Sequence, residues 1–242
     1  MSNIYKQIIN YQYGNDDIQN KLFPIPKYPY LQYNNNANYN IQLSNPSSFL
    51  TKAHLISLEN NLPSYEQYKD MKLLYTLTKD GASLRTLYDK AEGYHSLIIF
   101  IKDDKGNIFG GYSNEGLKCR PNKFYGNGET FLFSFYTGDD IHIFLNTGHD
   151  ENYIYSDSNI LCFGCSNESF SLYLKDNFLN YFMIYFKITI YIQSFKFLEI
   201  NGYSKKTETF NNPPLNINLN NEIENDFIIT DIEMYTFQTT GQ

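Results

Sequence analysis

The sequence contains no tryptophan and only three cysteines in 242 residues. So few cysteines exclude a disulfide-stapled scaffold and are typical of a protein in a reducing compartment. Charged residues are sparse, at 19%, and the net charge of −7 argues against a general nucleic-acid binder, because neutralising phosphates requires clustered Lys and Arg. The HExxH signature of zinc peptidases and the P-loop of nucleotide-binding proteins are also missing from the sequence.

The apolar side chains that are present indicate a folded protein. Hydrophobic residues make up 42% of the chain, with 23 Tyr and 19 Phe, which is too apolar for a wholly disordered protein and enough for a substantial core. Residues 1–10 show no targeting signal that we recognise, and Ser2 stands where N-myristoylation requires glycine. We therefore expect a cytoplasmic protein.

Residues 1–45 differ in composition from the rest. They hold Pro24, Pro26 and Pro29 within six positions, followed by an Asn-rich stretch over residues 34–40. This composition suits neither helix nor strand interior. We predict a flexible, roughly neutral tail over residues 1–45 that orders when it binds a partner, followed by a single domain over residues 46–240.

Two short amphipathic helices are predicted after the tail. Leu55, Leu58 and Leu62 form one helical stripe that Pro63 ends. Ser83 is placed to cap a second helix that ends at Gly93. The apolar face of this second helix consists of Leu84, Leu87, Tyr88 and Ala91.

Short β-strands are predicted for most of the remaining chain. Residues 97–101 form a continuous apolar run, and residues 104–107 have turn chemistry that leads into a further strand at residues 108–111. Further β-rich runs cover residues 130–136, 141–145, 152–155, 160–163, 170–174 and 227–237. We predict an α+β fold, a two-layer antiparallel β-sandwich flanked by a few short helices.

Several segments then follow one another in a recognisable order. They are residues 72–76, 79–88, 108–112, 124–133, 170–174, 202–204, 209–212 and 227–235. This succession resembles the TLDc family, which includes the oxidation-resistance proteins and nuclear receptor coactivator 7-like proteins, over about residues 47–237. The positions that carry the resemblance are Asp80, Gly81, Ser83, Leu84, Gly110, Gly126, Gly128, Glu129, Phe131, Phe133, Gly202, Ser204, Phe210 and Glu233.

The resemblance implies a function. It implies a non-catalytic protein that binds and regulates the vacuolar-type proton ATPase and contributes to oxidative-stress resistance. We accordingly expect no cofactor, no nucleic acid, no transmembrane span and a monomer, placed in the cytoplasm or peripherally on acidic organelle membranes through the ATPase. The alternative is a TLDc enzyme of unknown reaction that uses Glu129 and a histidine, His149, as acid and base.

The sequence departs from the family where tryptophan is usual. Met71, Tyr173 and Tyr235 stand at these places, and a buried tyrosine hydroxyl needs a hydrogen-bond partner. The bias toward Asn, Ile, Lys and Tyr is typical of an AT-rich protist genome.

An apolar insertion over residues 180–200 is the second departure. Lys187 and Gln193 in its middle argue against a membrane span. An extra hairpin is one explanation, and we favour a retained intron that reads through in frame, which sequencing the transcript would decide.

Other candidate sites have structural alternatives. Glu129 either does acid–base work beside an aromatic strand or accepts backbone N–H groups and holds a turn, which we favour. Gly126 and Gly128 around it are predicted to need positive φ. His149, with Asp150, Ser156 and Asp157 nearby in sequence, is either part of a triad or in a solvated acidic turn, which we favour.

Cys162 and Cys165 have CxxC spacing, but Cys119 is the only other cysteine, so a four-cysteine zinc site is excluded. We read the pair as small strand-end residues, with oxidant scavenging by the three thiols as a variant. Ser83 follows a turn at residues 80–82 and is predicted to cap a helix, because no motif places a base beside it to activate it as a nucleophile.

Overall fold

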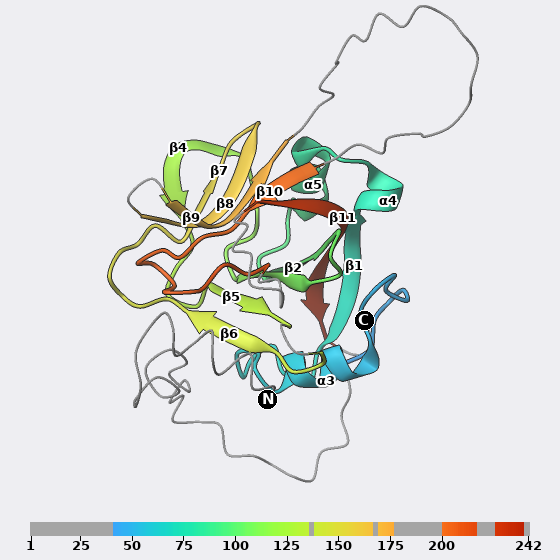
Figure 1. The fold of residues 1–242 in the computed structure, drawn as a ribbon. Helices are drawn as coiled ribbons and strands as arrows, with labels where there is room; N and C mark the ends of the chain where they lie inside the picture. The colour runs from blue at the N-terminus through green and yellow to red at the C-terminus, as the bar shows by residue number, and fades with distance from the viewer. Residues whose placement is uncertain (1–40, 136–137, 167–168, 177–199, 217–225, 240–242) are drawn as a thin grey trace, which may run out of the picture.

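Our computed structural model describes residues 41–135, 138–166, 169–176, 200–216 and 226–239. These residues form one curled, antiparallel eleven-stranded sheet in the order β4-β7-β8-β9-β10-β11-β2-β3-β5-β6, with β1 paired to β11 outside this path (Figure 1). The strands are β1 (Asp70–Thr76), β2 (Leu97–Asp103), β3 (Ile108–Ser113), β4 (Arg120–Tyr125), β5 (Phe131–Ser134), β6 (His142–Leu145), β7 (Ile154–Ser156), β8 (Ile160–Ser166), β9 (Ser169–Lys175), β10 (Ile200–Tyr203) and β11 (Asp226–Gln238). The predicted α+β class is confirmed. The two layers of the predicted sandwich are the two halves of this one curled sheet.

The sheet is buried on both faces at its centre, which explains the continuous apolar run at residues 97–101. Side chains alternate across a strand, so β2 divides its residues between two cores. Ile99 packs in the core enclosed by the sheet, together with Phe109 and Phe163, whereas Phe100 packs in a second core with Tyr235. Both halves of the curled sheet therefore share the first core, and the second core lies on the outer face.

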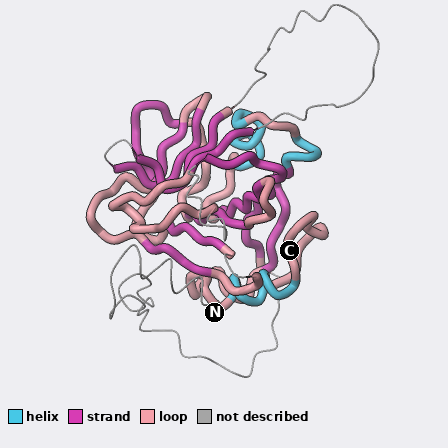
Figure 2. The backbone as a smooth tube through the Cα atoms, in the orientation of Figure 1, coloured by secondary structure: helices cyan, strands magenta, loops and turns pink. Residues whose placement is uncertain are grey.

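Three short helices lie at the ends of β1, namely α3 (Lys52–Glu59), α4 (Leu77–Asp80) and α5 (Leu84–Ala91). Figure 2 shows these few helical turns at the periphery of the strands. The predicted apolar face of α5 is confirmed, because Leu84, Leu87, Tyr88 and Ala91 are all buried. On α3, Leu55 and Leu58 are buried as predicted, but the helix ends at Glu59, so the buried Leu62 lies beyond it.

The last residues of the predicted tail pack on the domain. Ile41 is buried, and Leu43 forms a parallel bridge with Met71 of β1. Hydrogen bonds from Ser44 N to Met71 O (2.9 Å) and from Met71 N to Gln42 O (2.9 Å) hold this segment. Residues 1–40, and residues 180–199 of the predicted insertion, lie outside the described residues.

Two glycines permit close approaches that the sheet requires. A Cβ atom at Gly110 on β3 would lie 1.8 Å from Ile99 O of β2 and 2.8 Å from Cζ of Phe133. A Cβ atom at Gly202 on β10 would lie 2.1 Å from Cε2 of Phe227. Both positions carry the family resemblance, and each has a packing reason to be glycine.

Candidate functional site

Glu129 accepts hydrogen bonds from two side chains that are distant in sequence. The Tyr65 hydroxyl donates to Glu129 Oε2 at 2.7 Å, and the Asn114 amide donates to the same oxygen. The carboxylate is exposed, and its own backbone N–H donates to Asn127 Oδ1 at 2.9 Å. We predicted that the Glu129 carboxylate holds its turn by accepting backbone N–H groups. The donors in the structure are instead the Tyr65 hydroxyl and the Asn114 side-chain amide.

The contact continues inward through a second phenol. The hydroxyls of Tyr65 and Tyr112 lie 3.3 Å apart, and Tyr112 is completely buried. The Tyr112 hydroxyl also lies 3.5 Å from Oε1 of Glu66, a carboxylate only 1% exposed that pairs with Lys69 Nζ at 2.9 Å. We call Glu66, Tyr112, Tyr65, Glu129 and Asn114 the phenol chain. Of these five residues, only Glu129 was predicted from the sequence.

The turn that carries Glu129 is only partly as predicted. Gly126 has φ +95°, in the left-handed region that favours glycine. Gly128 has no positive φ, so the prediction was wrong there, and a Cβ atom at Gly128 would meet only Asn146 Nδ2 at 3.5 Å. Asn146 instead donates its amide to Gly128 O at 2.5 Å, which ties the turn to the end of β6.

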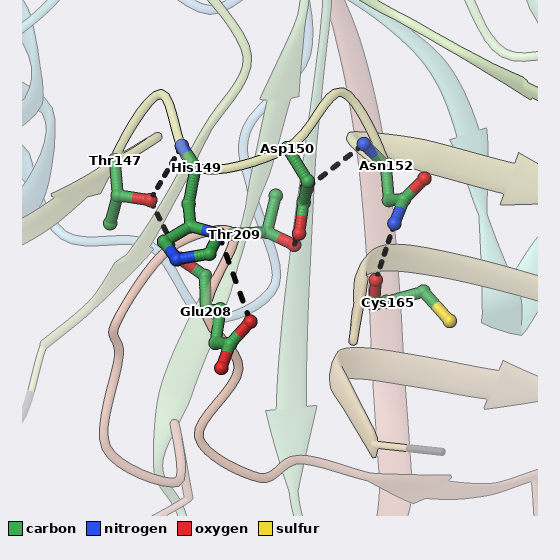
Figure 3. Close-up of polar contacts among 7 residues, drawn as sticks. All are labelled: Thr147, His149, Asp150, Asn152, Cys165, Glu208 and Thr209. Carbon is green, nitrogen blue, oxygen red and sulfur yellow. Dashed lines mark hydrogen bonds and ion pairs between the residues drawn. The ribbon is translucent and has the colours of Figure 1, made fainter. Parts of the chain in front are cut away.

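His149 lies in an exposed loop that contacts Glu208 and Thr209 (Figure 3). Its Nδ1 is 3.8 Å from Glu208 Oε2, and Thr147 donates its hydroxyl to Glu208 O at 2.6 Å. In the same loop, Asp150 accepts the Thr209 hydroxyl at 3.0 Å. The predicted solvated turn is therefore what the structure shows, with Glu208 as the neighbour of His149.

The triad hypothesis is not supported by the geometry. Ser156 is buried, donates to Lys118 O at 2.6 Å and lies 2.8 Å from the Tyr125 hydroxyl. Asp157 accepts the backbone N–H groups of Asn159 and Ile160. Glu129 and His149 likewise contact different partners, so the described contacts do not join them as an acid and a base.

Two of the three cysteines have environments that disfavour the thiolate. Cys162 is buried in the middle of β8, not at a strand end as predicted, and burial raises the pKa of its thiol to about 12. Burial also raises the pKa of Cys165, with a further contribution from Asp150. Because the thiolate is the reactive form, these environments weigh against oxidant scavenging by this pair.

Glu233 is an almost fully buried carboxylate that anchors the chain before α3. Its oxygens accept the Ser47 hydroxyl (2.5 Å), the Ser48 backbone N–H (2.8 Å) and the Tyr235 hydroxyl (2.8 Å). Asp231, two residues earlier on the same strand, accepts the Ser48 hydroxyl at 2.6 Å. The expected partner for the buried Tyr235 hydroxyl is thus present, and the resemblance at Glu233 has a structural reason.

The predicted turn and cap at residues 80–83 are confirmed. Asp80 Oδ2 accepts Thr76 N at 2.9 Å, and Asp80 Oδ1 pairs with Lys90 Nζ at 3.1 Å. Gly81 has φ +80°, and Ser83 caps α5 by accepting Thr86 N at 3.4 Å. No described contact places a base at the Ser83 hydroxyl, which serves as the cap.

The remaining positions of the resemblance belong to the interior. Ser204 is fully buried, donates to Ser171 O at 2.5 Å and accepts Leu215 N at 2.9 Å. The other members are core side chains, namely Leu84, Phe131, Phe133 and Phe210. Of the three places where the family usually has tryptophan, Met71 and Tyr235 are completely buried, whereas Tyr173 is half-buried.

Metal-binding clusters and membrane-spanning helices are both absent from the described ranges. No three His, Cys, Asp or Glu side chains gather there as a metal ion would require. Nor does any helix in the same ranges combine the length and apolar character needed to cross a bilayer.

His142 gives a pH dependence that can be tested. Burial lowers the pKa of its imidazole below the ordinary 6.5, against an opposing effect of Asp140. The folded state therefore releases this proton more readily than the unfolded state, and the free energy of unfolding falls as the pH drops from 6.5 towards the folded pKa. Urea unfolding between about pH 5 and 7.5 should show this slope. His142→Gln should flatten the slope, while the exposed-residue control His95→Gln should keep it; equal slopes in both variants would contradict the assignment.

The geometry thus defines an antiparallel α+β domain whose family positions mainly stabilise the fold. The TLDc domain family model matches residues 43–238, and the chain belongs to this family. It is similar to oxidation resistance protein 1 of Xenopus laevis, with 32% identity over 81% of this chain. It is also similar to oxidation resistance protein 1 of Homo sapiens (30%) and nuclear receptor coactivator 7 of Gallus gallus (29%), again over 81% of this chain. The matched region spans only 18–20% of the length of these relatives.

Proposed function

We propose that this TLDc protein contributes to oxidative-stress resistance by binding and regulating the vacuolar-type proton ATPase. The observation that carries the proposal is the family match over residues 43–238, together with relatives named for oxidation resistance. The ATPase as partner follows from the family resemblance. The protein acts as a monomer without a cofactor, in the cytoplasm and peripherally on acidic organelle membranes through the pump.

A protein that regulates the pump by binding must have different affinities for its two states. The protein shifts the balance between assembled and dissociated pump only if it binds one of the two states more tightly. Mixing purified protein with each state separately measures this difference. Equal affinity for both states would contradict regulation, even where binding itself is found.

Affinity purification from cell extract tests the partner. We expect tagged protein to recover ATPase subunits, and a Gly110→Val bait to lose them, because this substitution forces a side chain into the β2 backbone. A Gly128→Ala bait is the matched control, because a Cβ atom there has room. Folded wild-type bait that recovers no ATPase subunit would count against the ATPase, while loss of peroxide tolerance in cells lacking the protein would still support the stress role.

The enzyme alternative makes a different prediction. If Glu129 were an acid or base, Glu129→Gln in folded protein would abolish function in cells. We expect this variant to retain peroxide tolerance, because Glu129 and His149 have separate partners and our proposal requires no proton transfer between them.

A further inference from the structure

The hydrogen bond at the exposed end of the phenol chain has a defined direction. Tyr65 has one hydroxyl proton, which it donates to Glu129 Oε2 at 2.7 Å. Tyr65 can then only accept in its 3.3 Å contact with the Tyr112 hydroxyl, and the single proton of Tyr112 has two acceptors within reach, Tyr65 and, at 3.5 Å, Glu66 Oε1. The chain therefore runs from the buried Tyr112 through Tyr65 to the exposed carboxylate of Glu129.

We propose that Tyr65 is a site of one-electron oxidation at which Glu129 takes up the phenolic proton. The oxidants that fit are small radicals such as nitrogen dioxide and the carbonate radical anion. This proposal goes beyond the ATPase function and does not depend on it, since it concerns chemistry at one exposed side chain.

Access distinguishes Tyr65 from the other phenol–carboxylate pairs in the described residues. Tyr65 is 44% exposed and its acceptor is exposed, so a dissolved radical reaches the ring. The Tyr235–Glu233 pair has a similar contact of 2.8 Å, but both residues are buried. The half-buried Tyr155 donates to Asp157 over a longer distance, 3.2 Å.

The electrostatics of the site favour coupled loss of the electron and the proton. Burial, with a further contribution from Glu129, raises the pKa of Tyr65 to about 12, so the phenol is neutral near pH 7. Removing an electron from a neutral phenol makes its O–H strongly acidic, and a carboxylate already hydrogen-bonded to this proton accepts it without rearrangement. When the Tyr112 proton faces Tyr65 and not Glu66 Oε1, it also donates a hydrogen bond to the oxygen of the radical.

The reaction balances with these groups alone. The oxidant gains one electron, the Tyr65 O–H bond breaks, and the proton forms a new O–H bond at Glu129 Oε2. The products are the reduced oxidant, a neutral tyrosyl radical and a protonated Glu129. A thiol then returns a hydrogen atom to Tyr65 and becomes a thiyl radical, or nitrogen dioxide couples to the ring carbon beside the oxygen. In the second case the ring carbon loses its C–H proton to water, the oxygen takes its proton back from Glu129, and neutral 3-nitrotyrosine remains beside the Glu129 carboxylate.

Nitration of the folded protein tests the proposal. The full chain is treated with peroxynitrite in bicarbonate, which generates both radicals, and nitrotyrosine is quantified at each residue by peptide mass spectrometry. Glu129→Gln should lower nitration at Tyr65 by about tenfold, because the charged acceptor is lost. Nitration at Tyr155, which has its own acceptor, should not change.

Glu92→Gln is the matched control, with the same change of charge at an exposed residue at the end of α5. We expect wild-type nitration at Tyr65 in this variant. Equal nitration of Tyr65 in the wild type and in Glu129→Gln would overturn the proposal, because exposure alone would then set reactivity. An equal decrease in Glu92→Gln would also overturn it, because general charge would then be the cause.

Discussion

Gly110→Ala should leave little folded protein. The added Cβ atom would lie 1.8 Å from Ile99 O, a backbone atom of the neighbouring strand, so no rotamer change relieves the clash. Separating β2 from β3 would also disturb both cores, because β2 contributes side chains to each. We expect a loss of about 4 kcal/mol or more in the free energy of unfolding. Typical domains have only about 5–15 kcal/mol in total.

Circular dichroism and urea unfolding measure this effect. Gly128→Ala is the control, because the nearest atom to a Cβ there is Asn146 Nδ2 at 3.5 Å and its φ is not positive. We expect this variant within about 0.5 kcal/mol of the wild type. Similar unfolding midpoints for Gly110→Ala and the wild type would show that β2 and β3 are not paired in the register Phe100↔Gly110.

Glu233→Ala is expected to have the second-largest effect. It leaves the Ser47 hydroxyl, the Ser48 N–H and the buried Tyr235 hydroxyl without their acceptor. Because unpaired buried donors are costly, we expect a loss of about 3 kcal/mol or more in the free energy of unfolding. Hydrogen exchange should also accelerate at the Ser48 amide, whose acceptor is the removed carboxylate.

Glu233→Gln keeps the size and shape of the side chain but replaces one acceptor oxygen with an NH₂ donor. The amide oxygen can still face the fixed Ser48 N–H, and the NH₂ group then faces the Ser47 and Tyr235 hydroxyls, which can rotate to accept. We therefore expect a smaller loss, about 1–2 kcal/mol. Glu92→Gln, at an exposed position, should be neutral. If Glu233→Ala were as stable as Glu92→Gln, residues 47–48 would not be anchored by Glu233.

Local patterns were sufficient to predict the elements with strong periodicity. The helix α5 begins after Ser83 as its capping residue indicated, and the apolar run at residues 97–101 is a strand. Three strands were not predicted. β4 contains Pro121 and Asn122 (φ +64°) and has an irregular register with β7. β10 is short, and β1 has no regular alternation of buried and exposed residues, so tertiary pairing determines all three.

The candidate site also depends on tertiary contacts that local sequence patterns do not reveal. Glu129 was identified from its turn, but Tyr65, its phenol donor, lies 64 residues earlier in the chain. No spacing rule connects these two residues, because the fold alone brings the loop after α3 beside the turn before β5. For Tyr235, the sequence predicted that a buried hydroxyl needs a hydrogen-bond partner. It did not predict that this partner is Glu233.

The strand β11 has a consequence for how the domain is made in the cell. Residues 226–238 pair with β10, β2 and β1, which are separated from one another by long stretches of chain. The sheet therefore cannot be completed on the ribosome until these residues emerge. Until then, the edge of the apolar strand β2 that pairs with β11 has no partner strand. Such non-local pairing slows folding and leaves strand edges open to aggregation. Nascent chains of this protein should therefore depend on chaperones until translation has passed residue 238.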